Sequence, residues 1–310
     1  MRLGPFVRVW CCLGLVACAQ PPDEEADGGA EDGGWEDQAD LPPDLPADRP
    51  PDGVPDEAGR DLPFDIPAAD VLIYAHSRDT LYTFSAATLT VAEIGVFRLS
   101  DGTAAPSMLD LAVNEAGEVY TASETRLFRC DPATAAVSPV GDFGLAAGEA
   151  LYALTFLPAG VLRSDRETMI GATNAGAYYE VDPATAATTH LGQYPDGWLS
   201  SGDIVSIVGL GTYATLKRYD HPDSDMLAEM TFRGDGSVAA RVIGPITDGA
   251  TGFRQLFGLG YWGRSLYGFS NSGQLVEIDR DTAEGTLVTA ATGADQFWGA
   301  GVTTVAPVIF

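Results

Sequence analysis

Side chains that could carry acid–base chemistry are sparse in this chain. Asp110 and Asp203 each stand at the start of a predicted strand, and the only histidines are His76, His190 and His221. Two carboxylates that met a histidine in one pocket could serve a hydrolase or a lyase as general acid and base. No serine stands in a Gly-x-Ser-x-Gly elbow, and no two histidines have the spacing of a zinc site. We therefore predict no catalytic residues, and a hydrolase or lyase that uses these acids stays open as the alternative.

The longest predicted loop contains three carboxylates that could bind a cation. It spans residues 217–225, and its Asp220, Asp223 and Asp225 offer the oxygen ligands that Ca²⁺ prefers. Their spacing is not that of an EF-hand loop, which needs a central Gly and a distal Glu. The sequence favours a plain surface loop with no bound metal and no cofactor, and calcium at these aspartates is the weaker candidate.

A second group of residues contains aromatic and Arg side chains, the residue types that most often anchor a binding partner. Its members fall at predicted turns or strand starts that would share one face of the fold. The candidate ligand-binding face consists of Trp198, Arg218, Tyr219, Arg254, Trp298, Asp110 and Asp203. The alternative is a solvated rim whose aromatics wedge between repeats. The residues do not identify the ligand, which could be a protein, a peptide or a glycan.

The first eighteen residues have the pattern of an export signal. Arg2 and Arg8 flank a short start, and the apolar run 9–16 is far shorter than a membrane span needs. The run Leu15-Val16-Ala17-Cys18 matches the bacterial lipobox at each of its four positions, so this N-terminus resembles that of a bacterial lipoprotein. The resemblance implies that residues 1–17 are a signal peptide and that Cys18 carries lipid, which would make the membrane a partner.

An ordinary secretory signal that happens to contain Cys is the alternative reading of this segment. Residue 19 is Ala rather than Asp. By analogy with enterobacterial sorting, this favours the outer membrane of the cell envelope, facing either the periplasm or the surface. Several acyl chains would make a stable anchor, because each buried methylene contributes about 0.8 kcal/mol.

Residues 18–70 are predicted to form a lipidated Cys followed by a disordered tether. Residues 19–70 hold 17 acidic side chains against only Arg49 and Arg60, together with ten prolines. Such a segment cannot bury enough apolar surface to offset its ordering entropy. It would therefore act as an extended, solvated spacer.

Residues 71–310 form the predicted folded domain, which is also acidic. It holds 27 acidic and 13 basic residues, a net charge of −14. This balance argues against a nucleic-acid partner, which is bound through clustered Lys and Arg. Cys130 would be the one cysteine left after lipidation, so the domain must be held by its core; we predict that Cys130 is buried in a strand.

A repeat predicts the fold of this domain. The run Asp131-Pro132-Ala133-Thr134-Ala135-Ala136 recurs unchanged 51 residues later at 182–187, and a looser copy lies at 278–282. Each good copy follows a β-rich run and precedes a run that ends in Gly. Repeats of 40 to 50 residues indicate stacked supersecondary units, and four short strands per unit are typical of propeller blades.

The ends of the domain complete the count of blades. Four sets of four strands are predicted, at 109–143, 152–193, 203–244 and 256–291. Residues 71–97 supply three strands without an innermost one, and residues 298–305 supply one extra strand. We therefore predict an all-β propeller of five four-stranded blades, in which the C-terminal strand completes the first blade. An open sandwich or a β-helix is the alternative.

The turn within the repeat is similar to the Asp-Pro-x-Thr-Gly turn of bacterial propellers of the quinoprotein-like and YVTN kind. The match covers residues 131–134 and 182–185, and Ala replaces the final Gly in both copies. In those families the motif is architectural, so the resemblance implies a fold and no activity, and no quinone cofactor is carried over. The sequence as a whole predicts an envelope lipoprotein with a propeller as binding module, or a ligand-free structural envelope protein.

Overall fold

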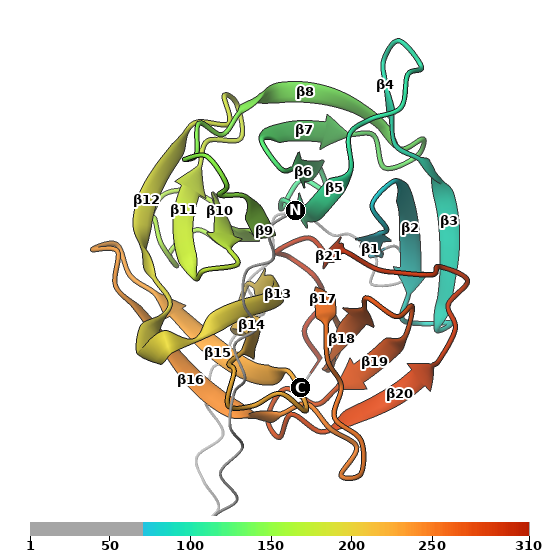
Figure 1. Ribbon diagram of the computed structural model, residues 1–310, viewed down its shortest axis with the longest axis vertical. Helices are drawn as coiled ribbons and strands as arrows, with labels where there is room; N and C mark the ends of the chain where they lie inside the picture. Colours follow the sequence, from blue (N-terminus) through green and yellow to red (C-terminus); the bar gives the residue numbers. More distant parts are fainter. Residues whose placement is uncertain (1–70, 310) are drawn as a thin grey trace, which may run out of the picture. The chain divides into compact units, whose positions relative to one another are not determined.

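The computed structural model describes residues 71–309. The predicted signal peptide, lipidation site and tether lie outside the described residues. Those that are described form five sheets arranged in a ring around a central axis (Figure 1).

The sheets follow one another along the chain, and in blades 2 to 5 the first of the four strands is innermost and the last of the four is at the periphery. Blade 1 is completed by the C-terminal strand and contains, from the centre outward, β21 (Gly299–Gly301), β1 (Ile73–His76), β2 (Thr80–Ser85) and β3 (Thr90–Val96). Blade 2 contains β5 (Met108–Val113), β6 (Val119–Ser123), β7 (Arg126–Cys130) and β8 (Ala136–Asp142). Blade 3 contains β9 (Leu151–Leu157), β10 (Thr168–Thr173), β11 (Ala177–Val181) and β12 (Thr188–Gln193).

The last two blades follow a short 3₁₀ turn, η2 (Pro195–Gly197). Blade 4 contains β13 (Leu199–Ile207), β14 (Gly211–Lys217), β15 (Met226–Phe232) and β16 (Val238–Pro245). Blade 5 contains β17 (Leu256–Trp262), β18 (Ser265–Ser270), β19 (Leu275–Ile278) and β20 (Gly285–Thr289). The prediction of five four-stranded blades is confirmed.

The C-terminal strand closes the ring as predicted. In β21, Gly299 pairs with His76 and Gly301 with Tyr74, so the chain's last strand is the innermost strand of the blade that β1 begins. The strand is shorter than the predicted 298–305, because a turn in which the amide of Ala306 donates to the carbonyl of Thr303 follows it. Without β21, the inner edge of β1 would have no hydrogen-bonded neighbour, and an exposed strand edge of this kind favours aggregation.

Blade 2 departs from the four-strand pattern. A fifth short strand, β4 (Arg98–Leu99), pairs in parallel with the outer edge of β8, at Ala136 and Val137. It lies in the connection between blades 1 and 2, where no strand is predicted. Its effect is to cover one outer sheet edge.

The repeated Asp-Pro-Ala-Thr segments form the turn between the third and fourth strands. In the first copy, the Asp131 carboxylate accepts hydrogen bonds from the amide of Ala133 at 2.9 Å and the hydroxyl of Thr134 at 2.8 Å. Asp182 makes the same bonds in blade 3. Ala135 stands at φ 58°, the left-handed region that Gly prefers. Blades 1, 2, 3 and 5 share this conformation at the equivalent position, which is occupied by Leu89, Ala135, Ala186 and Ala283. Blade 4 has a shorter turn, in which Gly236 stands at φ 86°.

Glycines in the outer strands let neighbouring blades approach each other. A Cβ atom at Gly141 in β8 would collide with the backbone carbonyl of Thr185, which lies in the repeated turn of blade 3. The Gly that ends each predicted run is therefore part of the inter-blade packing.

The core lies between blades rather than within any single sheet. In the largest cluster, the ring of Phe84 packs against Tyr267 and Phe269 at centroid distances of 4.9 and 5.7 Å. Cys130 is buried in β7 as predicted, and burial raises the pKa of its thiol to about 12. Within residues 71–309, no helix is long and apolar enough to cross a membrane.

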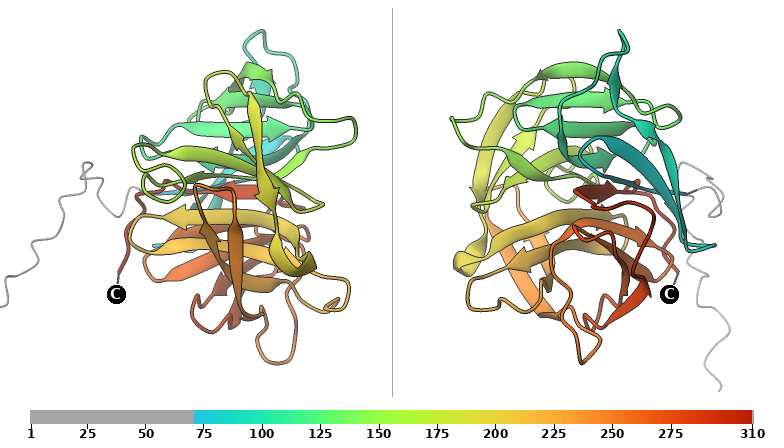
Figure 2. Two further views of the ribbon diagram at one scale, coloured as in Figure 1. Left: turned by 90° about the vertical axis from the view of Figure 1, so that its left-hand side faces the viewer. Right: turned by 45° about the vertical axis from the view of Figure 1, so that its right-hand side comes forward.

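The strands run between the two faces of the ring, so the connecting loops gather on those faces (Figure 2). The turns between second and third strands lie on one of them, which we call the groove face. The repeated Asp-Pro-Ala-Thr turns lie on the other. Since β1 ends at the groove face, its first residue, Ile73, lies toward the opposite face.

Candidate functional site

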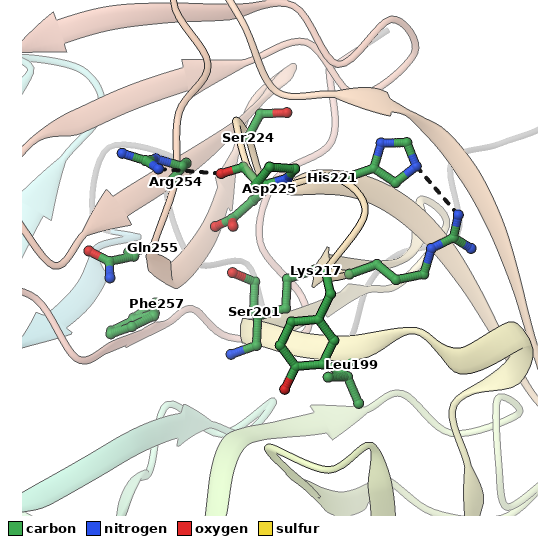
Figure 3. A pocket seen from close by; sticks show the side chains of 12 residues that line it. Leu199, Ser201, Lys217, His221, Ser224, Asp225, Arg254, Gln255 and Phe257 are labelled. Atoms are coloured by element: carbon green, nitrogen blue, oxygen red, sulfur yellow. Dashed lines mark hydrogen bonds between the residues drawn. The ribbon is translucent and has the colours of Figure 1, made fainter. Parts of the chain in front are cut away.

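Three adjoining cavities form a groove across the groove face, over the central axis of the ring. The first, of about 390 Å³, lies at the loop between β14 and β15 and is shown in Figure 3. The second, of about 220 Å³, shares Ser201, Lys217 and Phe257 with the first. The third, of about 520 Å³, shares Tyr152 and Trp298 with the second. Because of these shared walls, the three cavities are one continuous site.

Four of the predicted anchors line this groove: Arg218, Tyr219, Arg254 and Trp298. Arg254 and Tyr219 line its first cavity, and the Tyr219 ring is 94% exposed. Trp298 lines the second and third cavities, where the Arg78 guanidinium lies 3.9 Å from the centre of its ring. These side chains come from different blades, and the ring brings them onto one surface.

The structure corrects the prediction for Trp198. Only 7% of this residue is exposed, and it belongs to the core cluster between blades 3 and 4. It supports the groove from below, because the Arg218 guanidinium lies 4.4 Å from the centre of its ring and His221 stacks on it at 5.9 Å. Arg218 itself lines the first cavity and forms a two-point ion pair with Asp220, at 2.6 and 2.9 Å.

The structure also corrects the prediction for Asp110 and Asp203, which are fully buried in the innermost strands below the groove. The Asp110 carboxyl accepts hydrogen bonds from the amides of Leu111 at 2.8 Å and of Leu154 at 2.5 Å. It therefore joins the innermost strands of blades 2 and 3 and is not open to a ligand.

Asp203, which lies next to Asp110, plays the same role for the remaining blades. Its carboxyl accepts hydrogen bonds from the amides of Ile204 at 2.6 Å, Leu259 at 2.7 Å and Ala300 at 3.4 Å. It joins blade 4 to blades 5 and 1. Together the two aspartates connect the innermost strands of all five blades.

Burial raises the pKa of both carboxyls, and the nearby charge of Asp203 raises that of Asp110 further. A hydrogen bond between the two carboxyls favours protonated Asp110 and ionised Asp203. Both carboxyls are therefore harder to ionise than an exposed Asp, as expected for two acids placed close together in a low-dielectric site.

His76 completes this buried group. It is fully buried, which lowers its pKa to about 4, and its Nδ1–H donates to the carbonyl of Ser77 at 2.6 Å. Its Nε2 has no hydrogen-bond partner among residues 71–309. A Cβ atom at Gly299 would lie 2.5 Å from this nitrogen and would collide with Oδ1 of Asp110. The acids and the histidine therefore do converge, but among packed inner strands and not in a pocket that a substrate could enter.

The three candidate calcium ligands are not brought together. Asp220 pairs with Arg218, while Asp225 is buried and accepts a hydrogen bond from the amide of Leu256 at 2.8 Å. Asp223 is exposed. In the part of the chain that the structure describes, no three His, Cys, Asp or Glu side chains are grouped so that they could hold a metal ion.

The groove residues that were not among the predicted site residues include Arg78, Lys217 and Phe257. Lys217 opens the longest loop, and Phe257 precedes Gly258 as Trp298 precedes Gly299. The repeat register could have pointed to Phe257, because the two inner strands align. Nothing in the sequence distinguishes Arg78 from other turn residues.

No protein-family model and no curated protein matches this chain. Among solved structures, it is similar to a protein of unknown function from Bacteroides caccae, with 11% identity, a TM-score of 0.43 and coverage of 75% of this chain and 98% of that one. It is also similar to U3-55K, with 8% identity, a TM-score of 0.40 and coverage of 70% and 60%. A third similar structure is BBS1N, solved in complex with ARL6DN, with 11% identity, a TM-score of 0.34 and coverage of 72% of this chain and 61% of that one. The assignment as a β-propeller rests on the strand order described above.

Proposed function

We propose that the protein is a lipid-anchored lipoprotein of the bacterial envelope whose propeller binds a ligand in the groove. The observation that supports ligand binding is the groove itself, which crosses several blades and exposes aromatic rings beside cationic side chains. Aromatic and Arg side chains are the types that most often carry binding energy. The anchor is inferred from the lipobox at residues 15–18, and the outer membrane from Ala19.

The arrangement of the acids supports binding rather than catalysis. A general acid or base must come within hydrogen-bond reach of the substrate. Asp110, Asp203 and His76 are fully buried, and backbone amides occupy both carboxyls. A hydrolase or lyase at this position would need the innermost strands to move apart.

Hydrogen exchange of the full-length protein, with and without an extract of the bacterial envelope, tests the groove as a binding site. We expect slower exchange in residues 217–225, 252–257 and 296–299, because a bound ligand would cover these loops. The turns at 131–136 and 182–187 lie on the opposite face and serve as the internal control. Protection confined to those turns, or no protection at all, would refute the groove as the binding site and would favour a structural envelope role.

A further inference from the structure

The charge of the groove is opposite to that of the domain that contains it. Residues 71–310 hold 27 acidic and only 13 basic residues. Four of these 13 line the groove, namely Arg78, Lys217, Arg218 and Arg254. The acidic residues in its walls are Glu124, at one end, and the buried Asp225.

Three of the four cations are not neutralised by a carboxylate. Among the described residues, Arg78, Lys217 and Arg254 form no ion pair. Most arginines elsewhere in this part of the chain do form one: Arg126, Arg129, Arg163, Arg166, Arg241 and Arg280. Arg254 is held by a hydrogen bond of 3.3 Å to the carbonyl of Pro222, and Arg78 is held by the Trp298 ring. A guanidinium fixed in this way keeps donors available for an incoming anion.

Within residues 71–309, Asp225 is the one carboxylate in the first cavity, where it interacts with Lys217 and Arg254 without forming an ion pair with either. Burial raises the pKa of its carboxyl, although Lys217 and Arg254 act in the opposite direction. Its Oδ2 is already the acceptor for the Leu256 amide. Four cations against two acids in its walls give the groove an excess of positive charge, a setting that attracts anions.

The shape of the groove fits a polymer rather than a single small anion. Its cations stand at both ends and in the middle, and neutral polar side chains and aromatic rings lie between them. The neutral polar residues are Ser107, Thr125, Asn174, Ser201 and Gln255, and the aromatic ones are Tyr152, Tyr219, Phe257 and Trp298. A sugar ring can pack its apolar C–H face on such aromatics and direct hydroxyls to the polar groups.

The groove does not suit three of the common modes of peptide recognition, which need a free sheet edge, a continuous apolar channel for a helix or an aromatic ladder for a polyproline segment. A further mode is the capture of an acidic peptide by clustered cations, and poly-L-glutamate tests for it below. Here the groove crosses turns and strand starts, and its apolar side chains are separated by charged and polar ones. A carboxylated sugar polymer satisfies both the charge and the surface.

We propose that the groove binds an acidic polysaccharide, with carboxylates at Arg78, Lys217 and Arg254 and sugar rings on Tyr152 and Phe257. This inference rests on the proposed function and specifies its ligand class. Isothermal titration of the full-length protein with an oligogalacturonate tests it. Matched titrations use a neutral oligogalactan and poly-L-glutamate.

We expect the oligogalacturonate to bind, the neutral oligomer not to bind, and the affinity to fall as salt rises. The double variant Lys217→Ala/Arg254→Ala should bind at least about tenfold more weakly, since each charge-assisted hydrogen bond contributes on the order of a tenfold change. The control is Arg98→Ala/Arg233→Ala, which removes the same charge outside the groove and should change the affinity by less than about twofold.

Each other outcome contradicts the inference in a distinct way. Equal binding of the neutral oligomer would refute the role of charge, and tighter binding of poly-L-glutamate would refute the sugar class. If the oligogalacturonate did not bind but envelope extract still protected the groove loops from hydrogen exchange, the ligand class would be refuted and the proposed function would stand. If neither effect were seen, the proposed function would fall as well.

Discussion

At the scale of single residues, His76 and the two buried aspartates beside it make stability depend on pH in opposite directions. Burial lowers the pKa of His76 from 6.5 to about 4, so the unfolded chain binds a proton more readily than the folded one. Its contribution is present above pH 6.5 and is lost as the pH falls toward 4. The raised pKa values of Asp110 and Asp203 act conversely, because their contribution is lost as the pH rises through the folded-state values.

Replacing His76 with Phe should isolate the histidine part of this balance. The wild-type protein should lose roughly 3 kcal/mol more unfolding free energy than His76→Phe between pH 7 and pH 4, from the size of the pKa change. Both aspartates are present in both proteins, so their contribution largely cancels in the difference. Denaturant unfolding at the two pH values provides the measurement. Parallel pH profiles for the two proteins would show that His76 does not resist protonation.

At the scale of elements, the contact between an outer strand and the next blade's turn decides which glycines can be changed. A Cβ at Gly141 in β8 would overlap the carbonyl oxygen of Thr185, which is backbone and cannot rotate away. At Gly244 in β16, the corresponding Cβ would lie 3.5 Å from the carbonyl oxygen of Thr282, an ordinary contact. The two strands have the same place in their blades.

Gly141→Ala should therefore lower the free energy of unfolding by about 1–3 kcal/mol, the usual cost of overpacking. Gly244→Ala is the matched control and should leave it unchanged or raise it by about 0.4–1 kcal/mol, because Ala restricts the unfolded chain. Urea unfolding of both variants measures the difference. If the two substitutions had equal effects, the blade contact would not be as close as the structure indicates.

The elements were more predictable from the sequence than the site. The strands and the ring closure follow from local alternation and from an exact repeat, which are properties of short segments. The repeated turn even keeps its left-handed residue in blade 1, where Leu89 replaces Ala and the motif is lost. In contrast, the burial of Trp198 and Asp203 depends on how closely neighbouring blades approach, which no single segment encodes. The groove could be predicted as a face but not as a set of lining residues, since these come from loops far apart in the chain.

At the scale of the whole molecule, the proposed anchor depends on one thiol. Cys18→Ser removes the proposed site of lipidation and should move the protein from the membrane fraction to the soluble fraction, because the acyl chains supply the membrane affinity. Cys12→Ser is the control, because it makes the same change outside the lipobox and should leave the protein in the membrane fraction. Fractionation followed by immunoblotting measures both variants. A Cys18→Ser protein that remained membrane-bound would refute the lipoprotein assignment.

The direction in which the chain enters blade 1 has a consequence for how a ligand would be presented. β1 starts toward the face that carries the repeated Asp-Pro-Ala-Thr turns and ends at the groove face. The point of attachment for everything before residue 71 is thus on the side of the ring away from the groove. A protein fastened to a membrane through its N-terminus would therefore be held from the side of the ring opposite the groove, and a flexible tether over residues 19–70 would leave the direction in which the groove points unconstrained.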